Sequence, residues 1–378
     1  MTAPTEPQRG PAPPLVVVVV ANTRTRARQL RNMLLGGPGF VVAGDACTPE
    51  EAEELVLEHR PGVVLLDLAP ECGGLEAIER IMSARATPIV VCGDAADRAQ
   101  DALAAGAVDV VGALDALPTS PQYVTALRRH LRVASRIRVI THPRARLRAR
   151  GLLAEQRPVE APAEDGPASS AAPRLPRLDP VVVAIGASTG GPLALATILG
   201  ALPIDLDAAV LVVQHMADGF VEGLAHWLDG ISALPVVLAR DGQRLRPGMV
   251  HLAPARKNTL VRSGLRVELH DPLPGQFHIP GIDATFTSIG ATCHERAVGV
   301  LLTGMGRDGA AGLRKMRDKG AITIGQDEPT SVVWGMPAAA AALDAVVHEH
   351  ALPDIAEAVV SAVREAQEAT SDVAGGAR

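Results

Sequence analysis

Short apolar runs alternate along the chain with longer segments in which apolar residues recur every three or four positions. The runs have the β-branched content of buried strands, and the longer segments have the period of amphipathic helices. In the first third of the chain, we expect helices at 24–35, 49–59 and 75–84 and further helices after them. The alternating strands are expected at 15–20, 40–44, 63–66, 89–91 and 108–111. Five such units predict a doubly wound parallel sheet.

A second α/β pattern begins near residue 180. Its apolar runs, at 181–185, 208–213 and 297–302, are followed by glycine-rich turns or by helical segments. A chain of 378 residues with 47% hydrophobic and 21% charged residues has room for two such domains, each with its own core. The fold class is therefore α/β, with two doubly wound parallel-sheet domains. We expect a disordered N-terminus at 1–14, domains at 15–135 and 180–368, a linker at 136–179, and a disordered tail at 369–378.

The first glycine-rich turn places Ser188 between a buried strand and a helix. Gly186 and Gly190 flank the serine in the G-x-S-x-G spacing of a nucleophile elbow, in which small neighbours leave the hydroxyl accessible at the sheet edge. The helix N-terminus beside it stabilises negative charge. An isolated serine in such a turn is also typical of a helix N-cap, so the turn alone leaves both interpretations open.

Two further residues favour the interpretation of Ser188 as a nucleophile. His215 follows an apolar run and so lies at a strand end, where α/β sheets place their chemistry. Asp308 lies in the second glycine-rich turn, after the run at 297–302. Alone, the histidine is compatible with a structural role and the aspartate with a carboxylate at a helix N-terminus. Together with Ser188 they predict a serine hydrolase that needs no metal and no cofactor.

Five stretches of sequence carry a family resemblance. The longer ones are 184–191, 214–216 and 302–312, and the shorter ones are Ala253-Pro254 and Gly335-Met336-Pro337. In this order they resemble the catalytic domain of the chemotaxis protein-glutamate methylesterases, the CheB family. Two local departures are Ala217, where the family usually has proline, and 279–281, where it has a polar stretch.

The resemblance implies a role for each site residue. Ser188 would be the nucleophile, His215 the general base and acid, and Asp308 the carboxylate that orients the histidine. Thr189 and the Met305 backbone would support the oxyanion. The implied substrates are methylated glutamates of chemoreceptor cytoplasmic domains, with deamidation of receptor glutamines as a second activity, and a chemotaxis histidine kinase would be a further partner.

Two other functions stay open at this point. Gly304-x-Gly306-x-x-Gly309 satisfies a dinucleotide-binding fingerprint after a strand, and Asp327 follows the next strand. That interpretation leaves the turns at Ser188 and His215 without a role. The second alternative is a non-catalytic signalling adaptor that keeps only the esterase fold.

The first domain resembles a response-regulator receiver, with Asp67 at the phosphoacceptor position. Receivers carry an acidic pair, a Ser or Thr and a Lys around that aspartate, but here these positions hold Ala21-Asn22, Gly93 and Ala113. Phosphoryl transfer depends on cations that neutralise the phosphate oxygens. We therefore predict a pseudo-receiver that does not accept phosphate by the magnesium-dependent route. Alternative metal ligands would be Asp45, Asp94 and Asp97.

Charge and composition limit the partners. Nine arginines accumulate between 128 and 150, yet aromatic content is 2% and the net charge is −6, which argues against nucleic-acid binding. We expect the arginine-rich helix to pair with acidic surfaces of this chain or a partner. The apolar run at 15–20 is too short for a membrane span. The four cysteines show no pairing or metal spacing, which indicates reduced thiols and a cytoplasmic location.

Overall fold

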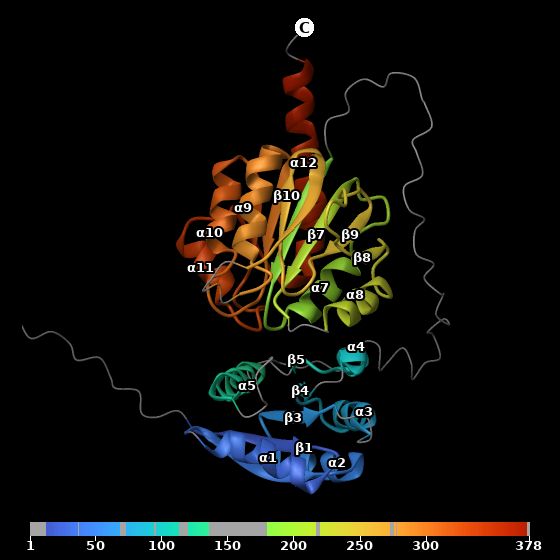
Figure 1. The fold of residues 1–378 in the computed structure, drawn as a ribbon, viewed down its shortest axis with the longest axis vertical. Coiled ribbons are helices and arrows are strands. Elements are labelled where there is room, and N and C mark those ends of the chain that lie inside the picture. The colour runs from blue at the N-terminus through green and yellow to red at the C-terminus, as the bar shows by residue number, and fades with distance from the viewer. Residues whose placement is uncertain are drawn as a thin grey trace, which may run out of the picture. The chain divides into compact units, whose positions relative to one another are not determined.

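The computed structural model describes residues 13–36, 38–68, 73–93, 96–112, 120–135, 180–216, 220–272, 276 and 278–375. The chain divides into two compact units, Met1–Arg146 and Leu147–Arg378. The predicted linker at 136–179 lies outside the described residues, as does most of the predicted disordered N-terminus. Both units are parallel-sheet α/β folds, which confirms the predicted fold class (Figure 1).

The first unit contains a five-stranded parallel sheet in the order β2-β1-β3-β4-β5. This is the flavodoxin-like order, in which the chain reverses direction beside the first strand. The expected strands are all present, and β3 extends one residue further so that it ends on Asp67. The strands are β1 (Leu15–Val20), β2 (Phe40–Ala46), β3 (Val63–Asp67), β4 (Ile89–Gly93) and β5 (Asp109–Gly112).

The helices of the first unit lie where the periodicity predicts them. They are α1 (Arg24–Leu35), α2 (Pro49–His59), α3 (Gly74–Ala84), α4 (Ala96–Ala105) and α5 (Pro121–Ala134). Two arginines of α5 differ from the expected pairing with acidic surfaces, while those of the predicted arginine-rich helix from 136 onward lie outside the described residues. Arg128 Nε donates to the Met33 carbonyl at 2.8 Å, and Arg132 Nη2 donates to the Pro38 carbonyl at 2.7 Å. These two arginines therefore fasten α5 to the backbone around the end of α1, not to an acidic surface.

The second unit contains a seven-stranded parallel sheet in the order β14-β13-β12-β6-β7-β9-β8. A separate antiparallel hairpin is formed by β10 and β11. The strands of the large sheet are β6 (Val181–Ala187), β7 (Ala208–Gln214), β8 (Val236–Leu238), β9 (Met249–Leu252), β12 (Ala297–Leu301), β13 (Ile322–Gln326) and β14 (His348–His350), and those of the hairpin are β10 (Asn258–Arg262) and β11 (Arg266–His270).

Helices cover both faces of the large sheet. On one face α9 and α10 lie side by side against β6 and β12 (Figure 1). On the other face α12 packs against β6, β12 and β13 and against α7. Because the chain winds in opposite directions from β6, right-handed crossovers place helices on both faces of the sheet. The helices are α7 (Gly191–Leu199), α8 (Val221–Asp229), α9 (Ile282–Cys293), α10 (Ala310–Asp318), α11 (Met336–Ala342) and α12 (Ile355–Gly375), with short 3₁₀ turns at Ser263–Leu265, His294–Arg296 and Leu352–Asp354.

The C-terminal end corrects one expectation. We predicted a disordered tail from residue 369, but α12 continues to Gly375. The amphipathic pattern that starts at Ile355 therefore persists beyond the predicted domain limit. Among the described residues, no helix is both long enough and apolar enough to cross a membrane.

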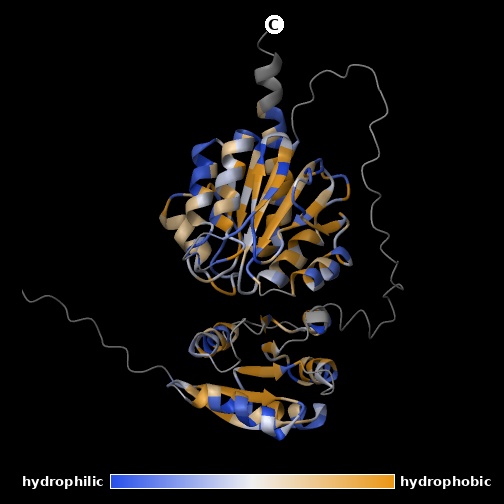
Figure 2. Ribbon diagram, in the orientation of Figure 1, coloured by the Kyte–Doolittle hydropathy of each residue, from blue (hydrophilic) through white to orange (hydrophobic). Residues whose placement is uncertain are grey.

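Burial explains why the central strands are continuous apolar runs. Every residue of β6, β7 and β12 is buried, and these strands are among the most hydrophobic parts of the fold (Figure 2). A parallel strand covered by helices on both faces has no solvent side that would favour alternation. The polar residues that matter for function therefore begin where these strands end.

Candidate active site

Three adjacent strands bring the predicted residues to one edge of the large sheet. Ser188 follows β6, His215 follows β7, and Asp308 lies in the turn after β12. Because β12, β6 and β7 are neighbours and parallel, their carboxyl ends lie together. The chain also reverses its winding direction at β6, and ligand sites of open α/β sheets form at such a point.

The turn that holds Ser188 is fixed by backbone and amide hydrogen bonds. Ser188 N donates to the Thr303 carbonyl at 3.0 Å, and the Ser188 carbonyl accepts from Gly191 N at 2.8 Å and from Gln214 Nε2 at 2.9 Å. Helix α7 has Gly190 as its N-cap, with φ +77°, a conformation that favours glycine. The N-cap interpretation of Ser188 is therefore wrong, because Gly190 occupies that position.

His215 and Asp308 form a nearly buried pair. The His215 Nε2 atom lies 2.8 Å from Asp308 Oδ2, and the two side chains are 10% and 11% exposed. Because a carboxylate can only accept, Nε2 carries the hydrogen of this bond. The other ring nitrogen, Nδ1, is buried and has no hydrogen-bond partner among the described residues. The ring therefore keeps one nitrogen for exchanging a proton.

Asp308 rests on the first backbone amides of α9. Its oxygens accept from Ile282 N at 2.8 Å, from Asp283 N at 3.0 Å and from Gly309 N at 3.1 Å. Burial alone would raise the pKa of Asp308. The hydrogen bond from His215 and the backbone amides outweigh it and lower the pKa below its ordinary value. The structural alternative for Asp308 was a carboxylate at a helix N-terminus. In the structure Asp308 does bind the N-terminal amides of a helix, and that helix is α9, which is distant in sequence.

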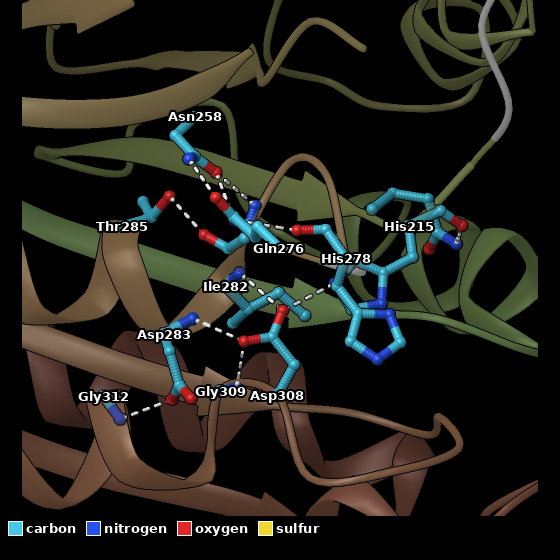
Figure 3. A network of polar contacts seen from close by, with 12 residues as sticks. His215, Asn258, Gln276, His278, Ile282, Asp283, Thr285, Asp308, Gly309 and Gly312 are labelled. Carbon is cyan, nitrogen blue, oxygen red and sulfur yellow. Dashed lines mark hydrogen bonds and ion pairs between the residues drawn. The ribbon is translucent and has the colours of Figure 1, made fainter. Parts of the chain in front are cut away.

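A polar network that sequence reasoning missed supports this pair (Figure 3). Asn258 and Gln276 exchange hydrogen bonds of 2.8 and 2.9 Å through their side-chain amides. Asn258 Oδ1 also accepts from Gly281 N, the residue before α9, and Gln276 Nε2 donates to the His278 carbonyl. The segment that leads into α9 is therefore held on both sides. Nothing in the local sequence of β10, Asn-Thr-Leu-Val-Arg, indicates this role for Asn258.

Asp283 connects the same network to α10. Its Oδ1 accepts from Gly312 N at 2.6 Å. Burial raises the pKa of Asp283, and the neighbouring charge of Asp308 raises it further, against the opposing effect of the Gly312 amide. Asp283 therefore fastens the start of α9 to α10, while Asp308 faces the histidine.

The second glycine-rich turn packs directly against the first. Thr303 Oγ1 donates to the Thr189 carbonyl at 2.9 Å and accepts from Val333 N at 2.9 Å. A Cβ at Gly304 would lie 2.7 Å from the Ser188 Cβ atom, so only glycine fits there. Thr189 is buried, and Met305, the next residue after this contact, is half-buried.

The same turn is poorly suited to a dinucleotide. Gly304 N donates to the Val333 carbonyl, and Gly309 N donates to Asp308, so these amides are already engaged. Asp327 Oδ1 accepts from Thr330 N within its own turn at 3.2 Å. The fingerprint therefore matches in spacing, but two of its three glycine amides bond within the protein instead of facing an open phosphate site.

The first unit has a different aspartate at its sheet edge. Asp67 is buried, and Arg26 contacts both of its carboxylate oxygens, with Nε 3.1 Å from Oδ2 and Nη2 3.3 Å from Oδ1. Burial would lower the pKa of Arg26, but the hydrogen bond and charge of Asp67 raise it above the ordinary value. A cation of the chain itself therefore pairs with the predicted phosphoacceptor.

The structure describes some of the other receiver positions. Ala21 is fully buried, and Gly93 lies so close that a Cβ there would be 3.1 Å from Asp67 Oδ1. Of the alternative metal ligands, Asp45 pairs with Arg31 at 3.1 Å. Asp94, Ala113 and the side chain of Asp97 lie outside the described residues, as does Ala217 in the second unit. The described residues contain no group of three potential metal-binding side chains.

Comparison with known proteins identifies the family. A CheB methylesterase model matches residues 183–359, and a response regulator receiver domain model matches 17–112. The protein-glutamate methylesterase/protein-glutamine glutaminase 3 of Paramagnetospirillum magneticum is 40% identical over 327 residues, 86% of this chain and 89% of that protein. The chain belongs to the CheB methylesterase family. The family resemblance noted in the sequence is thus confirmed.

Other CheB relatives extend the similarity over nearly the whole chain. The protein-glutamate methylesterase/protein-glutamine glutaminase 1 of Cupriavidus pinatubonensis is 39% identical over 353 residues, 92% of this chain and 97% of that protein. Among solved structures, the CheB methylesterase catalytic domain of Thermotoga maritima is 33% identical with a TM-score of 0.47, covering 49% of this chain and 99% of that domain. The two family models together show that this CheB chain joins a receiver domain to a methylesterase domain.

Proposed function

We propose that this chain hydrolyses methyl esters on glutamate side chains of chemoreceptor cytoplasmic domains, with Ser188, His215 and Asp308 as a catalytic triad. As a CheB methylesterase, the chain is an enzyme of the protein-glutamate methylesterase/protein-glutamine glutaminase class. The observation that carries the residue roles is the His215–Asp308 bond through Nε2, which leaves Nδ1 unpartnered at the edge that also holds Ser188.

The acylation step follows from these positions. The Ser188 hydroxyl oxygen attacks the ester carbonyl carbon while its proton passes to His215 Nδ1. The carbon–oxygen bond to the methoxy group then breaks, and the same proton leaves with methanol. Backbone donors at Thr189 and Met305 stabilise the oxyanion of the tetrahedral intermediate. A glutamyl ester on Ser188 remains.

Deacylation repeats the same proton transfer with water. His215 Nδ1 takes a proton from water as the oxygen attacks the acyl carbon, and it returns the proton to Ser188 Oγ as glutamate leaves. During each step the imidazolium is stabilised by Asp308, which its backbone donors keep ionised. A receptor glutamine would enter the same sequence with ammonia as the first leaving group, which accounts for deamidation.

The test is methanol release from methylated receptor by the full chain. We expect Ser188→Ala to lower the rate by about 10⁴-fold or more, as removal of a triad nucleophile does. Ser263→Ala is the matched control, because Ser263 is an exposed serine in a 3₁₀ turn beyond β10. Equal release by wild type and Ser188→Ala would contradict the triad. No release by either would favour the signalling adaptor.

We further propose that the receiver domain does not take up phosphate through the ordinary magnesium-dependent route. The Arg26–Asp67 pair supports this, because the guanidinium neutralises the carboxylate that would otherwise hold the metal ion and attack the phosphoryl donor. The docking partner of such a domain, for which a chemotaxis histidine kinase is the candidate, would then recognise the fold and not a phosphorylated state.

Incubation of the full chain with acetyl phosphate and Mg²⁺ tests this second proposal. We expect no labile acyl phosphate on Asp67 and no change in methanol release. Asp67→Asn serves as the control for labelling at other sites. An acyl phosphate that requires Asp67 and accelerates the esterase would refute the proposal.

A further inference from the structure

His278 lies face to face with the histidine of the proposed triad. The ring centroids of His215 and His278 are 4.9 Å apart, and the ring planes differ by only 8° (Figure 3). Aromatic rings at this separation and angle form a stacked pair. His278 itself is exposed, so its ring covers one face of a side chain that is otherwise nearly buried.

The hydrogen bonds of His215 leave its ring incompletely fixed. Nε2 is bonded to Asp308, while Nδ1 has no partner among the described residues. A ring bonded at one corner can tilt about that bond, and a tilt displaces Nδ1 from the position needed for proton transfer. Contact across a ring face opposes such a tilt without occupying either nitrogen.

The chain holds His278 in place through its backbone. Gln276 Nε2 donates to the His278 carbonyl at 2.9 Å, and Asn258 fixes Gly281 three residues later. The next residue after Gly281 begins α9, whose first amides bind Asp308. One short segment therefore places both the carboxylate partner of His215 and the ring that covers it.

The ring of His278 also faces the second glycine-rich turn. A Cβ at Gly306 would lie 3.9 Å from His278 Nε2, an ordinary contact distance. The ring thus lies between His215 and the turn that carries Met305.

We propose that His278 is a positioning residue, which keeps the His215 ring in the plane that directs Nδ1 toward Ser188. This inference rests on the proposed function. Because the contribution comes from ring stacking, an aromatic side chain without ionisable nitrogens should replace it. Loss of the His278 ring should lower kcat, because His278 acts on the orientation of the base and not on the substrate.

Steady-state methanol release by full-length variants tests this inference. The free energy of a stacked aromatic pair corresponds to a change in rate of roughly 2- to 10-fold. We therefore expect His278→Ala to lower kcat by up to about tenfold with little change in KM. His278→Phe should recover most of that loss. His270→Ala is the control, because His270 is an exposed histidine on the β10–β11 hairpin.

A proton NMR measurement separates positioning from a general structural effect. The hydrogen on His215 Nε2, bonded to a carboxylate, should give one sharp downfield resonance in the wild type and in His278→Phe. It should broaden in His278→Ala, because the untethered ring samples several tilts.

Each outcome bears on a different claim. Unchanged kcat in His278→Ala, while Ser188→Ala is inactive, would overturn the positioning role and leave the triad intact. Equal losses in His278→Ala and His278→Phe would also overturn it, because stacking alone would then be insufficient. If Ser188→Ala retained full activity, the proposed function itself would fail.

Discussion

Each unit of this chain places a buried aspartate at the carboxyl edge of a parallel sheet, but the two carboxylates have different partners. Asp67 pairs with the Arg26 guanidinium through two contacts. Asp308 pairs with the His215 imidazole through one, and backbone amides supply its remaining hydrogen bonds. The same topological position therefore carries a carboxylate with two distinct kinds of partner.

The difference lies in what the partner can do with a proton. An arginine stays protonated at every physiological pH, so its pair with Asp67 is static. A histidine can accept and return a proton, and the carboxylate beside it stabilises the charged form. A similar fold thus supports acid–base chemistry in one unit and charge neutralisation in the other.

Removing the negative charge of Asp308 should give the largest effect on methanol release. We expect Asp308→Asn to lower methanol release by roughly 10³- to 10⁴-fold, because a neutral amide cannot stabilise the imidazolium or fix its tautomer. The rate should be measured at saturating receptor, where kcat is isolated from binding.

Asp283→Asn is the matched control for that substitution. Asp283 lies at the start of α9, the helix whose amides bind Asp308. Its own carboxylate bonds to Gly312 and not to the histidine. Its loss of activity should stay within a few-fold. Similar losses in both variants would mean that the integrity of α9, and not the charge of Asp308, determines the rate.

Removing the arginine from the other pair should affect stability. In Arg26→Met, Asp67 becomes a buried carboxylate without its cation, and breaking such a pair costs about 3 to 5 kcal/mol. Denaturant unfolding of the full chain, followed by hydrogen exchange in β1 and β3, would locate the loss in the first unit.

The double variant Arg26→Met with Asp67→Asn shows whether that loss comes from the pair. Neutralising Asp67 should restore part of the stability, so the two substitutions should not be additive. Additive losses would mean that the guanidinium and the carboxylate do not interact appreciably in solution.

Two other histidines, one in each unit, should show opposite pH dependence. Burial lowers the pKa of His251 to about 4, so its neutral form stabilises the second unit above pH 6.5. That contribution, roughly 2 to 3 kcal/mol, should be lost as the pH falls from 6.5 towards 4. Hydrogen exchange in β9, compared between wild type and His251→Leu, would measure it.

His130 in the first unit should behave in the reverse sense. Burial lowers the pKa of His130, but its 2.7 Å contact with Asp109 outweighs burial and raises it. Its contribution is therefore complete below pH 6.5 and declines as the pH rises through the raised value. The measurement is the free energy of opening of the β5 amides, obtained from hydrogen exchange after correction for the intrinsic exchange rate. The same pH dependence of this free energy in wild type and His130→Leu would contradict the prediction.

Much of the fold could be predicted because the strands are covered on both faces. The runs at 181–185 and 297–302 are continuous and apolar for that reason, and glycine-rich turns mark where each ends. Ser188 and His215 could be proposed as site residues because each directly follows a strand, and Asp308 because it lies in the turn after a third strand. Parallel neighbours then bring the three residues to one edge.

Other contacts of the two sites could not be predicted from the residues near them in the sequence. The amides of α9 that bind Asp308 lie more than twenty residues away in sequence, and nothing near Asp308 indicates them. Arg26 lies in the first turn of α1, whose exposed face is also basic, so its contact with Asp67 depends on the tertiary fold. The helical end of α12 was missed because its composition resembles that of a polar tail.

Gln214 joins the proposed nucleophile Ser188 to the proposed base His215 through one side chain. Its Nε2 atom donates to the carbonyls of both Ser188 and His215, each at 2.9 Å. Gly191 leaves room for it, since a Cβ there would lie 2.0 Å from Gln214 Oε1. The serine turn and the histidine strand are thus clamped before substrate arrives. A serine-directed fluorophosphonate should consequently react with the free enzyme in a single exponential phase, without a lag.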